Sequence, residues 1–119
     1  MPIFIKRAYD TSDPQDGVRV LVDRLWPRGI KKSEAMVDEW LKEAAPTKEL
    51  RKAYHSGQLD WADFRIHYLA HLKQHREELR GLADRAHHEN ITLLFSSKNR
   101  DRNNAEVMRQ YLHMLQQTS

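Results

Sequence analysis

Apolar residues along this chain gather in three short runs that alternate with longer polar segments. Ile3–Ile5 is rich in β-branched and aromatic residues and ends at a basic pair, and Val18–Val22 forms a second run. The third run, Ile91–Phe95, is apolar at nearly every position. Runs of this length predict strands. Because the second and third runs are apolar on both faces, they predict central strands covered on both sides by helices.

Helical signals begin after the second strand. Ser33 is placed to cap a helix that carries Met36 and Val37, runs through Leu41 and ends before Pro46. Thr47 is then placed to begin a short helix that continues through Tyr54 and stops at a Ser-Gly pair.

The remaining helices are longer and strongly periodic. Asp60 is expected to cap the longest helix, whose apolar positions keep helical spacing as far as Ala86. Gly81 is a point at which this helix is expected to weaken or bend. After the third strand, Asn103 or Asn104 is placed to cap a last helix that carries apolar residues through Leu115.

The order of these elements is strand, strand, three helices, strand and helix, which indicates α/β layering. We expect a single layered α/β domain over residues 1–119, with a small, mostly parallel sheet of about three or more strands and about four flanking helices. The polar turn between the first two strands, residues 10–17, is short. Taken alone, it favours an antiparallel hairpin.

The amino-acid composition excludes several kinds of functional site. The 119 residues include no cysteine, which excludes disulfides, thiol nucleophiles and thiolate metal ligands. No apolar run has the length of a membrane span, and the opening MPIFIKRAYD becomes charged too soon for a signal peptide, so we expect a cytoplasmic protein with no membrane partner. The net charge of +3 permits an anionic partner without requiring nucleic acid.

The candidate chemistry lies at the strand ends. The segment RVLVDRLWPRGIKK places a basic loop with a tryptophan at the end of the second strand, and polar groups also follow the other two strands. If the strands are parallel, these groups meet at one edge, where open α/β sheets bind ligands. Guanidinium groups there suit phosphate or carboxylate. We expect ligand contacts from Arg7, Tyr9, Arg24, Trp26, Arg28, Ser96, Lys98, Asn99 and Asn103.

Two residues are candidates for acid–base chemistry, and each also has a structural interpretation. Asp23 follows the second strand directly, but it can instead form a buried ion pair with Arg24 while Trp26 plugs the edge of the core. His55, at a helix end, can act as an acid or base if it reaches the cleft, or else cap or pack. His67 and the histidines four and eight positions after it are expected to lie on a solvent-exposed side of their helix. We therefore expect no metal site and no cofactor.

Several segments together resemble a known family. They are IKRAYD, GVRVLVDRLWPRGIKK, ELRKAYH, FRIHYL and TLLFSSKNRDRNNA, and they cover the chain from Ile5 to about Leu115. This set resembles the YeaO-like branch of the family called domain of unknown function 488 (DUF488), with DRLWPRG as the specific signature. The resemblance implies a small bacterial α/β domain with a parallel layer, so we expect the first two strands to be parallel. It implies no particular reaction.

The same resemblance exposes a departure. The wider family often carries Cys and Glu at the end of the third strand and Cys-His-Arg at the last helix. Here those runs read Phe95-Ser96-Ser97 and Asn103-Asn104-Ala105, so chemistry built on those family residues is absent. Family motif positions that remain are Asp23, Arg24, Lys98, Asn99 and Asn103.

Three functions therefore compete. The first is a cleft that either only binds a small anionic or phosphorylated molecule or also converts it. The second is a nucleic-acid module, in which Trp26 or Tyr54 stacks on bases and binding weakens steeply with salt. The basic residues that would follow the nucleic-acid backbone are Arg24, Arg28, Lys31, Lys32, Lys48, Arg51, Lys52, Arg100 and Arg102. The third is a protein-interaction domain without catalysis. The sequence favours the first and leaves the oligomeric state open.

Overall fold

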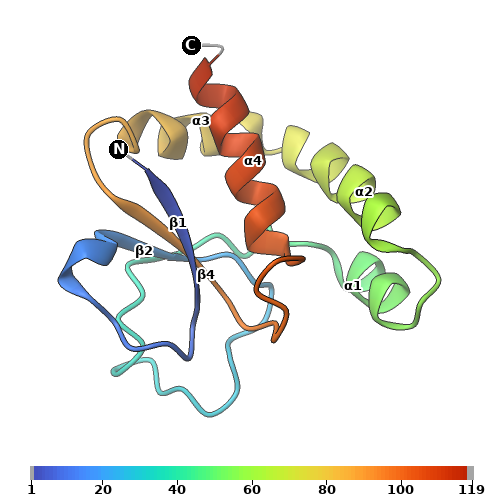
Figure 1. The fold of residues 1–119 in the computed structure, drawn as a ribbon, viewed down its shortest axis with the longest axis horizontal. Coiled ribbons are helices and arrows are strands. Elements are labelled where there is room, and N and C mark those ends of the chain that lie inside the picture. The colour runs from blue at the N-terminus through green and yellow to red at the C-terminus, as the bar shows by residue number, and fades with distance from the viewer. Residues whose placement is uncertain (1, 118–119) are drawn as a thin grey trace.

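A computed structural model describes residues 2–117 and shows a four-stranded, all-parallel sheet (Figure 1). Its strands are β1 (Ile3–Arg7), β2 (Val18–Leu21), β3 (Glu39–Trp40) and β4 (Ile91–Phe95), in the order β1-β4-β2-β3. The helices are the 3₁₀ turn η1 (Pro14–Asp16), α1 (Lys48–His55), α2 (Trp61–Lys73), α3 (Arg76–Arg85) and α4 (Asn104–Gln117). The α/β class, the parallel sheet and the number of α-helices expected from the sequence are confirmed.

The short connection between β1 and β2 does not form a hairpin, because β4 lies between these two strands. Both pair with β4 in parallel: Ile3 and Val18 each lie opposite Ile91. The chain crosses the width of one strand through η1, whose first turn is capped by the Asp13 carboxylate. A short connection can therefore join parallel strands here because it passes over a neighbour and needs no tight reversal.

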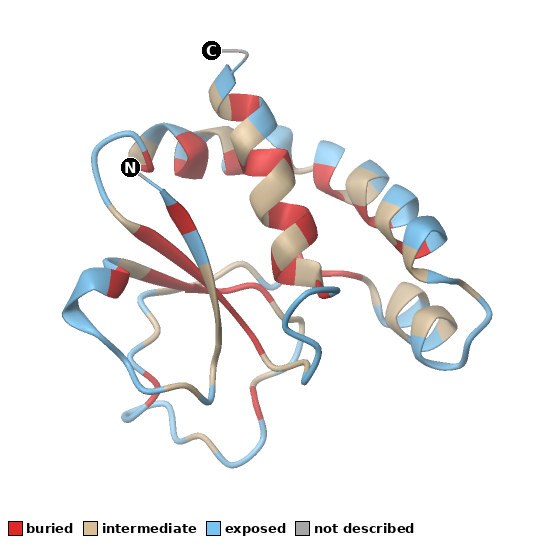
Figure 2. Cartoon of the chain, in the orientation of Figure 1, coloured by how far each residue is buried: buried red, intermediate tan, exposed pale blue. Residues whose placement is uncertain are grey.

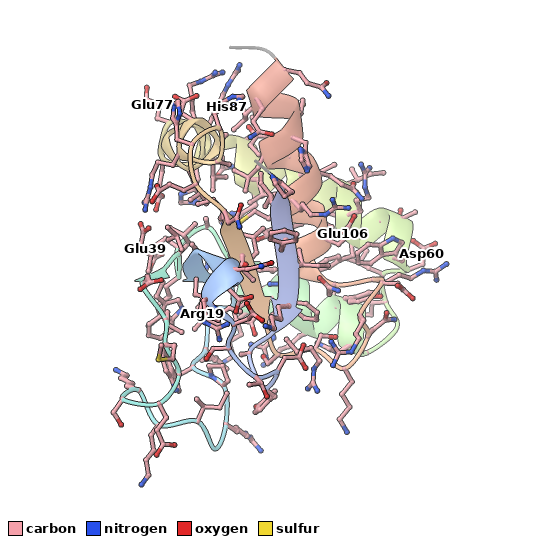
Figure 3. All side chains as sticks on the ribbon, turned by 60° about the vertical axis from the view of Figure 1, so that its left-hand side comes forward. Arg19, Glu39, Asp60, Glu77, His87 and Glu106 are labelled. Atoms are coloured by element: carbon pink, nitrogen blue, oxygen red, sulfur yellow. The ribbon has the colours of Figure 1, made fainter. Side chains whose placement is uncertain are left out.

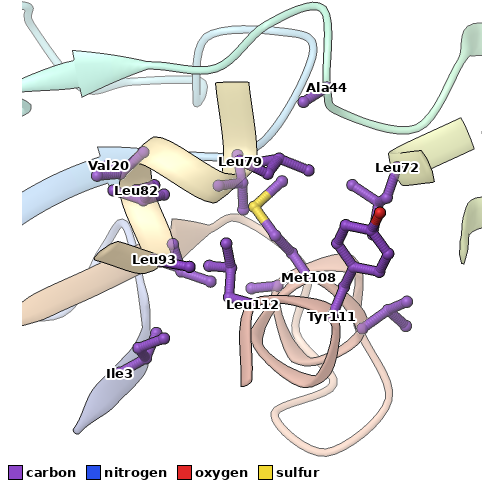
Figure 4. Close-up of a cluster of buried hydrophobic side chains, with 14 of the residues drawn as sticks. Ile3, Val20, Ala44, Leu72, Leu79, Leu82, Leu93, Met108, Tyr111 and Leu112 are labelled. Carbon is purple, nitrogen blue, oxygen red and sulfur yellow. The ribbon is translucent and has the colours of Figure 1, made fainter. Parts of the chain in front are cut away.

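Helices cover one face of the sheet and form the core with it. Side chains of Ile3, Val20 and Leu93 point to this face and meet Met108 and Leu112 of α4 (Figure 4). Every residue of β4 is buried, and α4 turns a buried stripe toward the sheet (Figure 2). No helix within residues 2–117 is long and apolar enough to cross a membrane.

The opposite face is covered without α-helices, so the expectation of helices on both faces is wrong. This face buries Leu21 and Leu94 together with a polar network. In that network Asp16 of η1 binds Lys6 (3.2 Å) and Arg19, and its carbonyl accepts the Thr92 hydroxyl (2.7 Å). Arg19 also donates to the Met36 carbonyl (2.9 Å). Arg19 and Glu106 of α4 lie on opposite sides of the sheet (Figure 3). A crossover of this length has no room for an α-helix, and this ion-pair network takes its place.

The expected helix from Ser33 to Leu41 is wrong. The chain makes one turn there, in which the Lys31 carbonyl accepts from Ala35 N–H, and it then leaves the helical region at Met36, whose φ is 53°. Residues 39–40 pair with β2 instead. Asp38 fixes this register because its carboxylate accepts the Arg19 N–H (2.9 Å). Pairing with residues 39–40 satisfies the backbone groups at the open edge of β2. This pairing stabilises the segment more than its weak local preference for a helix does.

The long helix expected from Asp60 to Ala86 is two helices. The break lies at Gln74 and His75, and Gly81 is inside α3 without interrupting it. The helix starts at Thr47 and Asp60 are confirmed, because each side chain accepts a backbone N–H of its first turn. The change of direction after α2 lets both α2 and α3 pack against α4.

Candidate functional site

A cleft of about 450 Å³ opens beyond the carboxyl ends of the strands. The loops after β2 and β4 lie at the lower end of the sheet in Figure 1, with α1 beside them. Its apolar lining comes from Tyr9, Leu25, Trp26, Pro27, Pro46, Tyr54 and Phe64. Its polar lining comes from Asp23, Arg24, Arg28, Arg51, His55, Ser96, Ser97, Arg102, Asn103 and Asn104.

Most of the residues selected from the sequence meet in this cleft. Those that line it are Tyr9, Asp23, Arg24, Trp26, Arg28, His55, Ser96 and Asn103. Three others, Arg7, Lys98 and Asn99, do not line it. Convergence follows from the all-parallel sheet, because the carboxyl ends of β1, β2 and β4 face the same edge.

Arg7 supports the wall of the cleft from behind. Its guanidinium donates to the carbonyls of Ser96 (3.0 Å) and Ser97 (2.9 Å), and it lies 4.9 Å from the centre of the Tyr9 ring. The Tyr9 hydroxyl in turn donates to the Arg28 carbonyl (3.0 Å). Arg7 and Tyr9 therefore connect three loops that border the cleft.

The loop before α4 is shaped by Asn99. Its side-chain oxygen accepts the N–H groups of Asp101 (3.0 Å) and Arg102 (2.9 Å), and its carbonyl accepts the Asn103 side-chain amide (3.0 Å). Asn103 caps α4, because its side-chain oxygen accepts Glu106 N–H (2.9 Å). Lys98 is exposed on this loop. Asn99 and Asn103 thus hold the segment that presents Arg102 to the cleft.

A bidentate ion pair closes the outer side of the same loop. Arg100 donates to both carboxylate oxygens of Asp10 at 2.8 and 2.9 Å. This hydrogen bonding from Arg100 lowers the pKa of Asp10 to about 2. The pair joins the loop after β1 to the loop after β4, so both walls keep a fixed spacing.

Asp23 holds three elements together. Its carboxylate accepts the N–H (2.9 Å) and the hydroxyl of Ser96, together with the side-chain amide of Asn104 (2.9 Å). These donors come from the end of β4 and the start of α4. The carboxylate is therefore committed to joining β2, β4 and α4.

Arg24 lines the cleft, but its guanidinium makes contacts that hold the fold together. Its guanidinium donates to the carbonyls of Pro46 and Ala45, both at 3.1 Å, and lies 3.6 Å from the Glu43 carboxylate. Asp23 and Arg24 therefore bind different partners, and the ion pair between them that the sequence suggested is absent from residues 2–117.

Trp26 is fixed in the wall by its own loop. Its indole N–H donates to the Ile30 carbonyl (2.6 Å), and its ring meets Trp40 edge-to-face at 5.5 Å. The Lys32 ammonium lies 5.7 Å from the ring centre. Trp40 in turn donates to the Asp23 carbonyl (2.7 Å). The aromatic pair thus gives the basic loop a rigid base.

Three guanidinium groups in the cleft have no partner. Within residues 2–117, the arginines whose side chains make no hydrogen bond or ion pair are Arg28, Arg51, Arg76, Arg80 and Arg102. Arg28, Arg51 and Arg102 all line the cleft, where the only carboxylate is the committed Asp23. The cleft is therefore strongly electropositive.

Sequence reasoning missed several lining residues as parts of one site. Arg51 and Arg102 entered only among scattered basic residues, and Tyr54 only as a possible stacking ring, because nothing local shows that α1 folds back beside the strand ends. His55, at the end of α1, lines the cleft and lies 6.0 Å from the Tyr54 ring centre. The spacing of ELRKAYH, which puts Arg51, Tyr54 and His55 on neighbouring turns, was the available signal.

The parallel layer and its basic edge cleft place the molecule among small α/β proteins that have a site at the ends of their strands. Over residues 2–119 the sequence matches the family model described as "Inactive DUF488-N3 subclade". The chain therefore belongs to the DUF488 family, as the sequence resemblance indicated.

The curated relatives are full-length matches. The chain is 51% identical over 115 residues to the uncharacterized protein YeaO of Escherichia coli (strain K12), covering 97% of this chain and 100% of YeaO. It is 38% identical over 113 residues to the uncharacterized proteins Mb3100c of Mycobacterium bovis and Rv3073c of Mycobacterium tuberculosis, covering 93% of each chain. No solved structure matches the chain.

Proposed function

We propose that this protein binds a small anionic or phosphorylated ligand in the basic cleft and does not convert it. The observation that carries the proposal is that one cleft is lined by three arginines, Arg28, Arg51 and Arg102, whose side chains have no hydrogen-bond or ion-pair partner within residues 2–117. A cleft of about 450 Å³ falls within the range of small-molecule sites, roughly 300–1,000 Å³. Unpaired cations held together repel one another, and a bound anion removes that repulsion.

Binding without conversion is supported by the residues at the strand ends. Asp23 is committed to three donors from β4 and α4 and has no free role as a base. Ser96 and Ser97 stand where the wider family often carries Cys and Glu. The description of the matching family model as an inactive subclade agrees with this interpretation.

Thermal melting with a panel of anions tests the proposal. The panel contains inorganic phosphate, sugar phosphates, nucleotides and short oligonucleotides. A ligand at one hundred times its dissociation constant adds about 2.7 kcal/mol to the free energy of unfolding, which raises Tm by several degrees for a domain of this size. We expect at least one small phosphate compound to produce this shift.

Arginine variants show whether the shift comes from the cleft. Each charge-assisted hydrogen bond contributes about 1.5–3 kcal/mol, so Arg28→Ala, Arg51→Ala and Arg102→Ala should each weaken binding about tenfold or more. Arg76→Ala is the matched control, since Arg76 also has no partner but lies on α3, outside the cleft. Equal losses in the control and the cleft variants would contradict the proposed site.

The nucleic-acid alternative predicts a different response. Binding to a phosphate backbone falls steeply as salt rises because counterions are released. A Tm shift produced only by oligonucleotides, and abolished by moderate salt, would replace the small-ligand proposal with that alternative.

A further inference from the structure

We infer that the ligand of this cleft is a phosphate monoester carried on a planar ring, of the class that includes nucleoside monophosphates. This inference rests on the proposed function and names its ligand class. Two independent features of the cleft support it: the number of free guanidinium groups, and an aromatic wall that a bare anion does not use.

The number of cations favours phosphate over carboxylate. Arg28, Arg51 and Arg102 come from three different segments, and each offers several N–H donors in a planar fork. A carboxylate has one charge and two oxygens, which one guanidinium satisfies in a bidentate pair. A phosphate monoester has a charge of about −1.5 to −2 near neutral pH and three terminal oxygens. Three guanidinium groups therefore match a phosphate in both charge and donor number.

The cleft also has an aromatic lining, and one of its rings is held in place. Tyr54 is stacked on Phe64 with ring centres 4.7 Å apart, and Trp61 supports it at 6.0 Å. Phe64 is 3% exposed, so it backs the wall, while Tyr54 is half-buried and still lines the cleft. The Tyr54 hydroxyl has no hydrogen-bond partner within residues 2–117. Its role within the described structure is therefore that of a ring.

Together these features define the shape of the ligand. An inorganic phosphate would leave the apolar side of a cleft of about 450 Å³ in contact with water. A planar ring attached to the phosphate can lie against Tyr54, and stacking of bases on aromatic side chains strengthens nucleotide binding in other proteins. The preformed wall loses little conformational freedom on binding, so most of this stacking energy increases affinity.

Calorimetric titration of the full chain with matched probes tests the inference. The probes are the four ribonucleoside 5′-monophosphates, ribose 5-phosphate, which lacks the ring, and the four nucleosides, which lack the phosphate. We expect at least one nucleotide to bind about tenfold more tightly than both ribose 5-phosphate and its own nucleoside. Equal affinity of ribose 5-phosphate and every nucleotide would overturn the inference while leaving an anion site. Absence of binding by all phosphate probes would reject the proposed function as well.

Variants at Tyr54 locate the ring. Tyr54→Leu should reduce nucleotide affinity to the level of ribose 5-phosphate while leaving ribose 5-phosphate binding unchanged, and Tyr54→Phe should restore nucleotide affinity because it restores the ring. If Tyr54→Leu fails to fold, the probe comparison in the unaltered protein still decides the inference. A folded Tyr54→Leu protein that keeps its preference for nucleotides would overturn it.

Discussion

Asp23 and Arg28 lie in one loop, but the structure uses them in opposite ways. The Asp23 carboxylate accepts three hydrogen bonds from Ser96 and Asn104 and so holds the fold together. The Arg28 side chain has no partner within residues 2–117 and lines the cleft. Both residues belong to the DRLWPRG signature, so one short motif combines a structural clamp with a free cation.

This difference predicts different costs on substitution. Asp23→Ala leaves three donors near the strand ends without their acceptor and should lower the free energy of unfolding by about 2–4 kcal/mol. Arg28→Ala removes no contact and should change the free energy of unfolding by less than about 0.5 kcal/mol. Urea unfolding monitored by circular dichroism measures both values. A large loss of stability in Arg28→Ala would make that arginine structural and count against the cleft proposal.

The carboxyl of Asp10 should affect stability in a defined acid range. Because hydrogen bonding from Arg100 lowers the pKa of Asp10 to about 2, folding favours the ionised form. The stabilising effect is fully present above the unfolded pKa of about 3.9 and is lost as the pH falls through about 2. The difference in unfolding free energy between the unaltered protein and Asp10→Asn should therefore shrink between pH 4 and pH 2.

Urea titrations at several pH values measure that difference. Asp84→Asn is the control for the loss of one negative charge, because the Asp84 side chain is exposed and has no ion-pair partner within residues 2–117. A gap for Asp10→Asn that stays constant down to pH 2 would show that the pair with Arg100 does not stabilise the fold.

The pKa of Asp16 is also lowered, but its environment differs from that of Asp10. Burial raises its pKa, while the N–H of Asp13 and the cations Lys6 and Arg19 lower it, and the net pKa lies below the ordinary value. Its stabilising effect is likewise lost as the pH falls through the folded pKa. The sheet face without helices therefore depends on charge, and we expect it to weaken in acid before the apolar core does.

At the scale of elements, the chain between η1 and β2 passes close to Asn90, the residue before β4. Gly17, with φ of 66°, connects η1 to β2, and the neighbouring Val18 N–H donates to the Asn90 carbonyl (2.9 Å). A Cβ atom at Gly17 would lie 2.1 Å from that same carbonyl oxygen. Glycine is needed here for its backbone angle and for the close approach of two chain segments.

This close approach predicts that two glycines with similar backbone angles differ in cost. Gly57 also has a positive φ, 84°, but a Cβ atom there would meet nothing within 4 Å. Gly57→Ala should cost about 1–2 kcal/mol from backbone strain alone. Gly17→Ala should cost about 3 kcal/mol or more, because β2 and Asn90 must also move apart. Urea unfolding of both variants measures the difference, and equal costs would show that the approach at Asn90 relaxes easily.

In the segment of residues 31–41, the local sequence correctly predicts one helical turn but not the strand that follows it. Ser33 and the apolar residues after it have helical features, and one helical turn does form at Lys31 to Ala35. The turn stops because Arg19 and Asp38 draw the following residues to the edge of β2. In α1, α2 and α4, by contrast, the cap and the buried face agree, so sequence reasoning located their starts correctly.

At the scale of the whole molecule, the two faces of the sheet are built by different means. Helices α2, α3 and α4 bury an apolar face, while η1 and the loop of residues 31–38 cover the other face with an ionic network. The molecule is accordingly flat, with extents of 39 × 38 × 22 Å. Loops on the second face and α1 beside the first meet at the carboxyl edge, where the cleft forms (Figure 1).

The sequence by itself determined the features that depend on neighbours along the chain. Apolar runs marked β1, β2 and β4. Capping residues marked the helix starts at Thr47, at Asp60 and at one of Asn103 or Asn104, and the structure shows Asn103 as the cap of α4. These properties depend on hydrogen bonds and side-chain periodicity within a few residues.

Only the tertiary structure decided how distant groups are paired. In the sequence, Arg7 and Arg24 were candidates for ligand contact and Asp23 for acid–base chemistry, but partners from the end of β4, α4 and the segment before α1 bind all three side chains. Within residues 2–117, the side chains of Arg51 and Arg102 have no partner because no carboxylate from another described segment reaches them. Whether a charge holds the fold or faces a ligand depends on which remote acceptors the fold brings within hydrogen-bond distance, and local sequence does not encode that distance.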